Sequence, residues 1–146
     1  MRAAFRVLAI LIALGVVVQA GTIALAWFTV LGELNDGAVL SEDSERNLGH
    51  NVHGIVGMMV MPVLGLALLI VSFFAKIPSG VTWAAIVFGL VVLQVALAIV
   101  SFGVSEIGAL HGINALVLAA VAGRAGALGR DTAPASSTPA GTRASA

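Results

Sequence analysis

Long apolar stretches separated by short polar ones dominate the pattern along this chain. The apolar runs cover residues 7–31, 52–74, 81–104 and 107–122. A helix that crosses the hydrocarbon core of a membrane needs about 20 mostly apolar residues, and the first three runs meet that length. None of the runs alternates apolar and polar residues as a half-buried strand does, so we expect helices. The fourth run is long enough only if its helix continues past Arg124 toward Arg130.

This pattern predicts an all-α fold, an integral membrane four-helix bundle that occupies residues 1–130. The helices are expected at about 7–31, 52–74, 81–104 and 107–124 or longer. The tail, residues 131–146, is rich in Ala, Ser, Thr and Pro and is expected to be disordered.

The first 20 residues also have the basic start and apolar centre of a signal peptide. The apolar run continues to Leu31, however, whereas the apolar centre of a signal peptide is only about 7–15 residues long. We therefore favour an uncleaved first helix.

Composition excludes several classes of protein. The chain is 60% hydrophobic and 10% charged, which is too apolar for a soluble surface and for a disordered chain. The seven Lys and Arg residues are scattered, so no basic patch for nucleic acid is present. Cysteine is absent from the sequence, which excludes disulfides, thiolate metal ligands and a cysteine nucleophile.

The formal net charge of zero hides a separation of charge along the predicted topology. With four crossings, one side holds Arg2, Arg6, Lys76, Arg124, Arg130 and Arg143 against Asp131. The other side holds Glu33, Asp36, Glu42, Asp43, Glu45 and Glu106 against Arg46. Lys and Arg accumulate on the cytoplasmic side of membrane proteins. We therefore expect the chain in the inner (cytoplasmic) membrane of the cell, with both termini in the cytoplasm and the acidic loop, residues 32–51, outside.

Two histidines carry the main chemical hypothesis. His53 and His111 fall near the outer ends of the second and fourth helices, and ionisable groups in such positions are functional candidates. Small residues lie about one turn from each: Gly49, Gly57, Gly108 and Ala115. They leave room for a flat macrocycle, so we predict a b-type haem with His53 and His111 as axial ligands.

Asn114, on the same helical face as His111, is a candidate to support a ligand or a propionate. His53 and His111 can lie at the same depth in the membrane only if the fourth helix has its longer form. In the alternative interpretation, the small residues only let helices pack closely and the histidines lie in interfacial water.

A second hypothesis is a Zn or Cu site on the outer face. His50 and His53 are three residues apart and share a helical face, and His111 and Glu106 could complete the ligand set. Gln19 and Gln94 lie in the middle of helices, where we expect each to form an interhelical hydrogen bond.

The two halves of the chain also resemble one another weakly. VVVQA at residues 16–20 is similar to VVLQV at 91–95, and His-Gly-Ile occurs at 53–55 and at 111–113. The halves would be parallel repeats, since both begin on the same side.

Four helices, a long first outer loop and one histidine at the outer end of helices two and four resemble one half of a haem A synthase. Small uncharacterised four-helix bacterial membrane proteins share this pattern. The resemblance implies His53 and His111 as axial haem ligands. His50 stands where that family has a glutamate, so the catalytic carboxylate has no counterpart here.

Three functions remain open on this basis. The first is a non-enzymatic haem protein for electron transfer or haem sensing, with a membrane redox partner or as a homodimer. The second is a cofactor-free accessory subunit in the lipid bilayer, and the third is a haem-modifying enzyme of the haem A synthase type.

Overall fold

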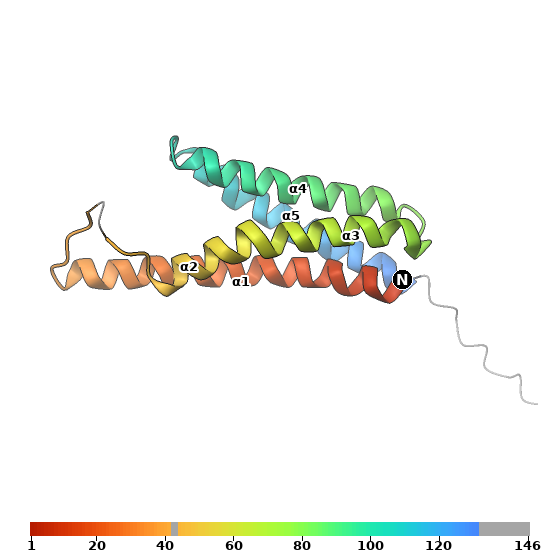
Figure 1. Cartoon of the computed structure of the whole chain (residues 1–146), viewed down its shortest axis with the longest axis horizontal. Helices are drawn as coiled ribbons and strands as arrows, with labels where there is room; N and C mark the ends of the chain where they lie inside the picture. The colour runs from red at the N-terminus through yellow and green to blue at the C-terminus, as the bar shows by residue number, and fades with distance from the viewer. Residues whose placement is uncertain (42–43, 132–146) are drawn as a thin grey trace, which may run out of the picture.

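All regular secondary structure in the described part of the chain is helical. The computed structural model describes residues 1–41 and 44–131, with only the backbone for 129–131. Its elements are α1 (Arg2–Asn35), α2 (Leu48–Ile55), the π-helix η1 (Val56–Val60), α3 (Met61–Ala75), α4 (Gly80–Ser101) and α5 (Ile107–Asp131) (Figure 1). The elements α2, η1 and α3 follow one another without a break. The predicted tail beyond residue 131 lies outside the described residues.

Four helices are long and apolar enough to cross a membrane, which confirms the all-α class and the number of predicted spans. They cover Arg2–Asn35, Leu48–Ala75, Gly80–Ser101 and Ile107–Leu128, as expected of a multi-pass membrane protein. Most of them extend beyond the apolar runs, because hydropathy marks the apolar part of a helix and not its ends. The fourth helix continues past Arg124 to Asp131, which is the longer form that matched histidine depth required.

The four long helices pack in a ring. Both α1 and α4 contact α3 and α5, so α1 lies diagonally opposite α4 and α3 lies opposite α5. The largest fully buried side chains are Phe5, Ile12, Leu68, Val87, Val91 and Leu118. Toward the other end of the bundle, the pair α1–α2 diverges from the pair α4–α5 (Figure 1). The core is therefore closed at the end that carries the N-terminus and open at the opposite end.

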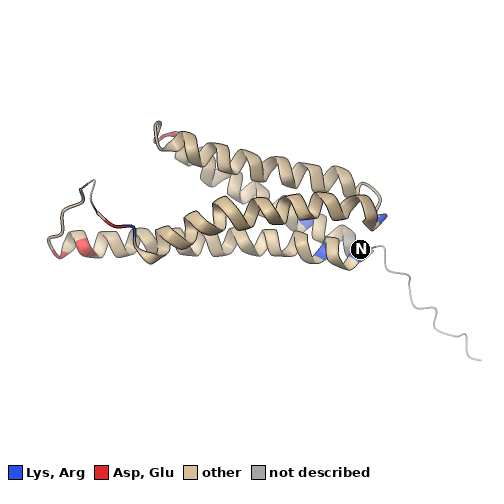
Figure 2. Ribbon diagram, in the orientation of Figure 1, with Lys and Arg blue, Asp and Glu red and all other residues tan. Residues whose placement is uncertain are grey.

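Charged residues of the described chain gather at the two ends of the bundle (Figure 2). The closed end carries Arg2, Arg6, Lys76 and Arg124, and the open end carries Glu33, Asp36, Glu45, Arg46 and Glu106. Between these ends the surface is largely apolar, with exposed side chains that include Leu14, Val17, Val63, Ile70, Phe73, Ile99 and Leu116. Such a surface is too apolar for water and fits a hydrocarbon environment.

The weak repeat in the sequence is also present in the structure, as a repeat of buried positions. In α1 the buried residues Ala9, Ile12 and Val16 are each 75 positions before the buried residues Ala84, Val87 and Val91 of α4. Likewise, three buried residues of α3 each have a buried counterpart 57 positions later in α5. The pairs are Met61 with Leu118, Gly65 with Ala122, and Leu68 with Ala125. The two helix pairs thus use the same positions to form the core.

The π-helix η1 explains why the spacing changes within the second element of the repeat. His53 and His111 are 58 positions apart, one more than the buried pairs that follow. In η1 the Met61 N–H bonds the Val56 carbonyl, a π-type bond that adds one residue to the turn. Pro62 follows directly and has no N–H to donate to the preceding turn, so a local change of helix geometry is expected here. The helix predicted at 52–74 is therefore interrupted by one extra residue.

A close approach of α2 to α1 fixes the beginning of the second pair. Asn47 caps α2 by accepting from the His50 N–H at 3.1 Å, and its side-chain amide donates to the Ala26 carbonyl at 2.8 Å. Gly49 is buried there, and a Cβ on it would lie 2.6 Å from both the Ala26 nitrogen and the Thr22 oxygen. Only glycine fits between the two backbones at this point.

We predict that Gly49→Ala lowers the free energy of unfolding by about 1–3 kcal/mol, because the new methyl group meets backbone that cannot move aside. Gly54→Ala is the matched control, since a Cβ there has no neighbour within 4 Å. Alanine favours a helix over glycine by about 1 kcal/mol, so the control should be neutral or stabilised. Reversible denaturation in detergent micelles measures both, and equal stability of the two variants would contradict the predicted contact.

Candidate functional site

Gln19 of α1 and His53 of α2 form a reciprocal pair of hydrogen bonds. The Gln19 Nε2 donates to the His53 backbone carbonyl at 2.9 Å. In return, the His53 Nδ1 lies 3.0 Å from the Gln19 backbone carbonyl. Each residue thus uses its side chain to bond the main chain of the other, which sets the depth and the ring orientation of His53.

The same arrangement recurs in the second helix pair, between Gln94 of α4 and His111 of α5. The Gln94 Nε2 donates to the His111 carbonyl at 3.0 Å, and the His111 Nδ1 lies 3.1 Å from the Gln94 carbonyl. We call these two arrangements the Gln–His clasps. The expected interhelical bonds of Gln19 and Gln94 are confirmed, and their partners are the two candidate ligand residues.

The clasps determine which imidazole nitrogen is protonated. A backbone carbonyl only accepts hydrogen bonds, so Nδ1 of both His53 and His111 must carry the proton. The Nε2 of each ring is then the acceptor nitrogen, which is the atom through which such a histidine binds a metal. Metal-binding histidines almost always donate their other N–H to such a carbonyl or to a carboxylate.

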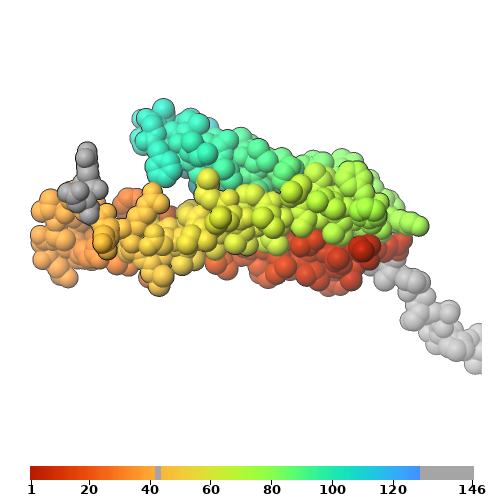
Figure 3. Space-filling model, viewed as in Figure 1, coloured from red at the N-terminus to blue at the C-terminus, as the bar shows by residue number. Residues whose placement is uncertain are grey.

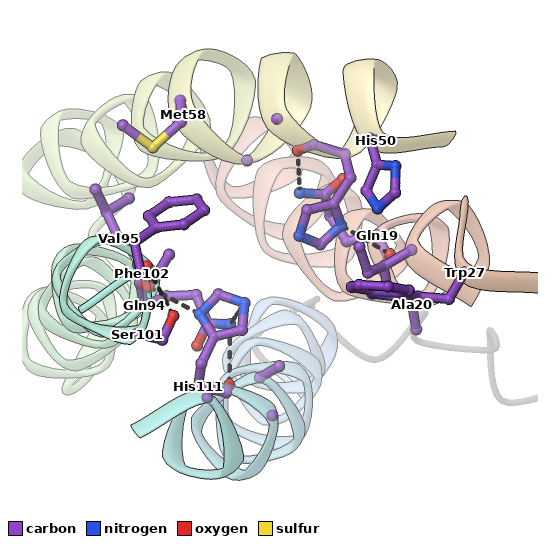
Figure 4. A pocket seen from close by; sticks show the side chains of 18 of the residues that line it. Gln19, Ala20, Trp27, His50, Met58, Gln94, Val95, Ser101, Phe102 and His111 are labelled. Atoms are coloured by element: carbon purple, nitrogen blue, oxygen red, sulfur yellow. Dashed lines mark hydrogen bonds between the residues drawn. The ribbon is translucent and has the colours of Figure 1, made fainter. Parts of the chain in front are cut away.

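His53 and His111 come from diagonally placed helices, and their rings make an edge-type contact at the open end of the bundle. Figure 4 shows the His111 ring beside Gln94 in the cavity. The centroids of the two imidazole rings lie 6.4 Å apart, with an angle of 61° between the ring planes. Two imidazoles that bind one metal ion from opposite sides have centroids about 6 Å apart, because each metal–nitrogen bond is about 2 Å long. By their separation alone, the two rings could both reach one metal centre placed between them.

A cavity of about 1030 Å³ surrounds the two rings and opens between the diverging helix pairs, where the space-filling surface is hollowed (Figure 3). Most of its lining is apolar, and Val16, Ile23, Met61, Val91, Val95 and Leu118 contribute to it. The aromatic side chains Trp27 and Phe102, which occupy equivalent positions 75 residues apart, lie on its walls. A volume of this size holds a large apolar cofactor or ligand.

The other predicted site residues have distinct places. Gly57 lines the cavity beneath the Gln19 amide, where a Cβ would lie 2.6 Å from Nε2, so it leaves space for the first clasp. Asn114 is buried and donates to the Leu90 carbonyl at 3.0 Å and to the Gln94 Oε1 at 2.6 Å. It therefore supports the second clasp, a role that the sequence had suggested only in general terms.

The structure gives no support to the outward-facing metal site with three or more ligands. His50 lines the cavity, and its ring packs against Trp27 with the centroids 5.4 Å apart. Among the residues that the structure describes, no three His, Cys, Asp or Glu side chains are grouped as metal ligands. His50 and Glu106 therefore do not join His53 and His111 in one such group.

The first repeat lacks a counterpart of Asn114. The position equivalent to Asn114, counted from the histidine, is Val56, which has no hydrogen-bond donor in its side chain. Accordingly, the Gln19 Oε1 is buried without a hydrogen-bond partner. A buried amide oxygen of this kind is costly and can accept a bond from a bound molecule or water. The Asn-to-Val difference between the two repeats is the signal of this asymmetry in the sequence.

Comparison with protein-family models, with curated proteins and with solved structures finds no match for this chain.

We predict that the Nδ1 of both His53 and His111 carries a proton, because each Nδ1 faces a backbone carbonyl. Nitrogen NMR of histidine-labelled protein in detergent near pH 8 distinguishes the two tautomers. Single substitutions of His50, His53 and His111 by Ala assign the three signals. A protonated Nε2 with a bare Nδ1 at His53 or His111 would refute the clasp at that residue.

Proposed function

We propose that this protein is a bacterial inner-membrane protein that binds b-type haem, with His53 and His111 as axial ligands. The observation that carries the proposal is the pair of neighbouring imidazoles with centroids 6.4 Å apart, each fixed by a backbone carbonyl at Nδ1. The Nδ1 bond to a carbonyl is typical of histidines that bind a metal through Nε2, and the short distance between the rings would let both reach one metal. A haem bound there would supply reversible one-electron chemistry, which suits electron transfer, or a ligand-dependent signal, which suits haem sensing.

The surroundings of the histidines support a porphyrin over a bare ion. A bare Zn or Cu ion usually needs three or four protein ligands, and the described residues offer no such group. The cavity is instead large, mostly apolar and open at one end, as a porphyrin with its polar edge toward water requires.

The rim of the cavity has polar groups for that edge. Ser41, Ser44 and Ser105 line its outer part, and Arg46 is the one cation among the described lining residues. Propionate groups carry negative charge and pair well with a guanidinium group. Arg46 is also the exception in an otherwise acidic loop, which a role beside propionates would explain.

The membrane orientation follows from charge. The basic end of the bundle lies in the cytoplasm, and the acidic end with the cavity faces outward, because Lys and Arg stay on the cytoplasmic side. An outward-facing haem would exchange electrons with a membrane redox partner or within a homodimer. The alternative functions are a cofactor-free accessory subunit and a haem-modifying enzyme.

We predict that the protein, purified in detergent from haem-replete cells, has a Soret band that shifts on reduction with dithionite. His53→Ala should abolish or strongly reduce the bound haem, and His50→Ala should leave the spectrum unchanged, because the His50 ring packs on Trp27 and the His53 ring on His111. A colourless wild-type protein would overturn the proposal in favour of a cofactor-free subunit. Extracted haem with altered side chains would instead support the enzyme.

We also predict that Ser41→Cys is labelled from outside the cell and Ser79→Cys is not. The chain has no native cysteine, so each variant carries a single thiol. Ser41 lies in the acidic loop and Ser79 in the turn between α3 and α4, at opposite ends of the bundle. Spheroplasts treated with a membrane-impermeant maleimide test the prediction, and permeabilised membranes should label both variants. Labelling of Ser79→Cys alone would reverse the proposed orientation.

A further inference from the structure

The two histidines occupy equivalent positions, but the surroundings of their Nε2 atoms differ. At His111 the Gln94 Nε2 lies 3.0 Å from the ring Nε2. Since the His111 proton is on Nδ1, its Nε2 accepts this bond and the amide donates it. The lone pair through which His111 would bind a metal is therefore occupied by a hydrogen bond from its own clasp.

Gln94 is held firmly in this position. One hydrogen of its amide goes to the His111 carbonyl, and the other goes to the ring Nε2. Its Oε1 accepts from Asn114 at 2.6 Å, and Asn114 is only 7% exposed. The amide thus has all its donors and its acceptor engaged, which stabilises the capped state of His111.

His53 has no such cap. Its partner Gln19 donates to the His53 carbonyl, and no hydrogen bond to the His53 Nε2 occurs among the described residues. The first repeat has Val56 in place of Asn114, and Gln19 Oε1 has no partner. The lone pair of His53 is available as the structure stands.

We infer that His53 is the permanent ligand and His111 an exchangeable one, so that the His111 side of the site admits a small diatomic molecule such as CO, NO or O₂. This inference rests on the proposed haem function and assigns unequal roles to its two histidines. Binding through His111 requires the Gln94 amide to leave Nε2, which costs a hydrogen bond that binding through His53 does not cost. The free energy of that bond biases the site toward the state in which His111 is not a ligand.

The test uses full-length haem-loaded protein in detergent, with haem content, the spin state of the ferric form and CO binding to the reduced form as readouts. The wild type should bind CO. His111→Ala should keep its haem in a high-spin form. His53→Ala should retain about tenfold less haem than His111→Ala, or none, because its remaining histidine must lose one hydrogen bond before it binds haem.

The cap is tested by Gln94→Leu, which frees the His111 Nε2. This variant should become low-spin and bind CO about tenfold more weakly, the size expected for one hydrogen bond. Gln19→Leu is the comparison variant, because it also removes a bond to a histidine carbonyl but touches no Nε2 atom, so any loss of haem in it should occur without a change to the low-spin form. Asn114→Leu, which releases Gln94, should shift CO affinity in the same direction as Gln94→Leu and serves if that variant does not fold.

The outcomes separate the two proposals. A wild-type protein without haem refutes the proposed function itself. A haem-loaded wild type that binds no CO, or equal haem loss in His53→Ala and His111→Ala, keeps the proposed function and overturns the unequal roles. Unchanged CO affinity in both Gln94→Leu and Asn114→Leu overturns the cap.

Discussion

The need to satisfy polar groups within an apolar bundle governs the structure around the cavity. Gln19 and Gln94 lie deep in helices that are otherwise apolar, where an amide without a partner is costly. Each finds its partner on the main chain of a histidine, and that histidine bonds back through Nδ1. These reciprocal bonds fix the depth and the rotation of both rings, so the geometry of the candidate site is a by-product of hydrogen-bond satisfaction.

The repeat gives this constraint its symmetry, and small departures from the repeat give the site its asymmetry. Equivalent residues of the two helix pairs form the core, and equivalent Gln–His clasps stand above it. The π-helix adds one residue after His53, and Asn114 has no counterpart in the first pair. The two halves therefore keep the same fold while they present chemically different surroundings to whatever lies between the rings.

Packing also divides the bundle along its length. Large side chains such as Phe5 and Leu68 are fully buried in the closed part of the bundle. Toward the acidic end, small residues line the space between the diverging pairs, among them Gly54, Gly57, Gly108, Gly112 and Ala115. A cavity persists there because these residues lack the volume to close it. The closed end provides stability, and the open end provides room for a ligand.

Hydropathy and charge in the sequence alone determined the helical class, the four candidate spans and the separation of charge, because each depends only on the order of residue types. They also placed His53 and His111 at the same end of the predicted helix bundle. Only the tertiary structure decided which residues pair: Gln19 with His53, and Gln94 with His111. It also decided that the Gln94 amide caps the His111 Nε2. These contacts join residues 34 and 17 positions apart and depend on helix rotation, which a nearly uniform apolar pattern does not specify.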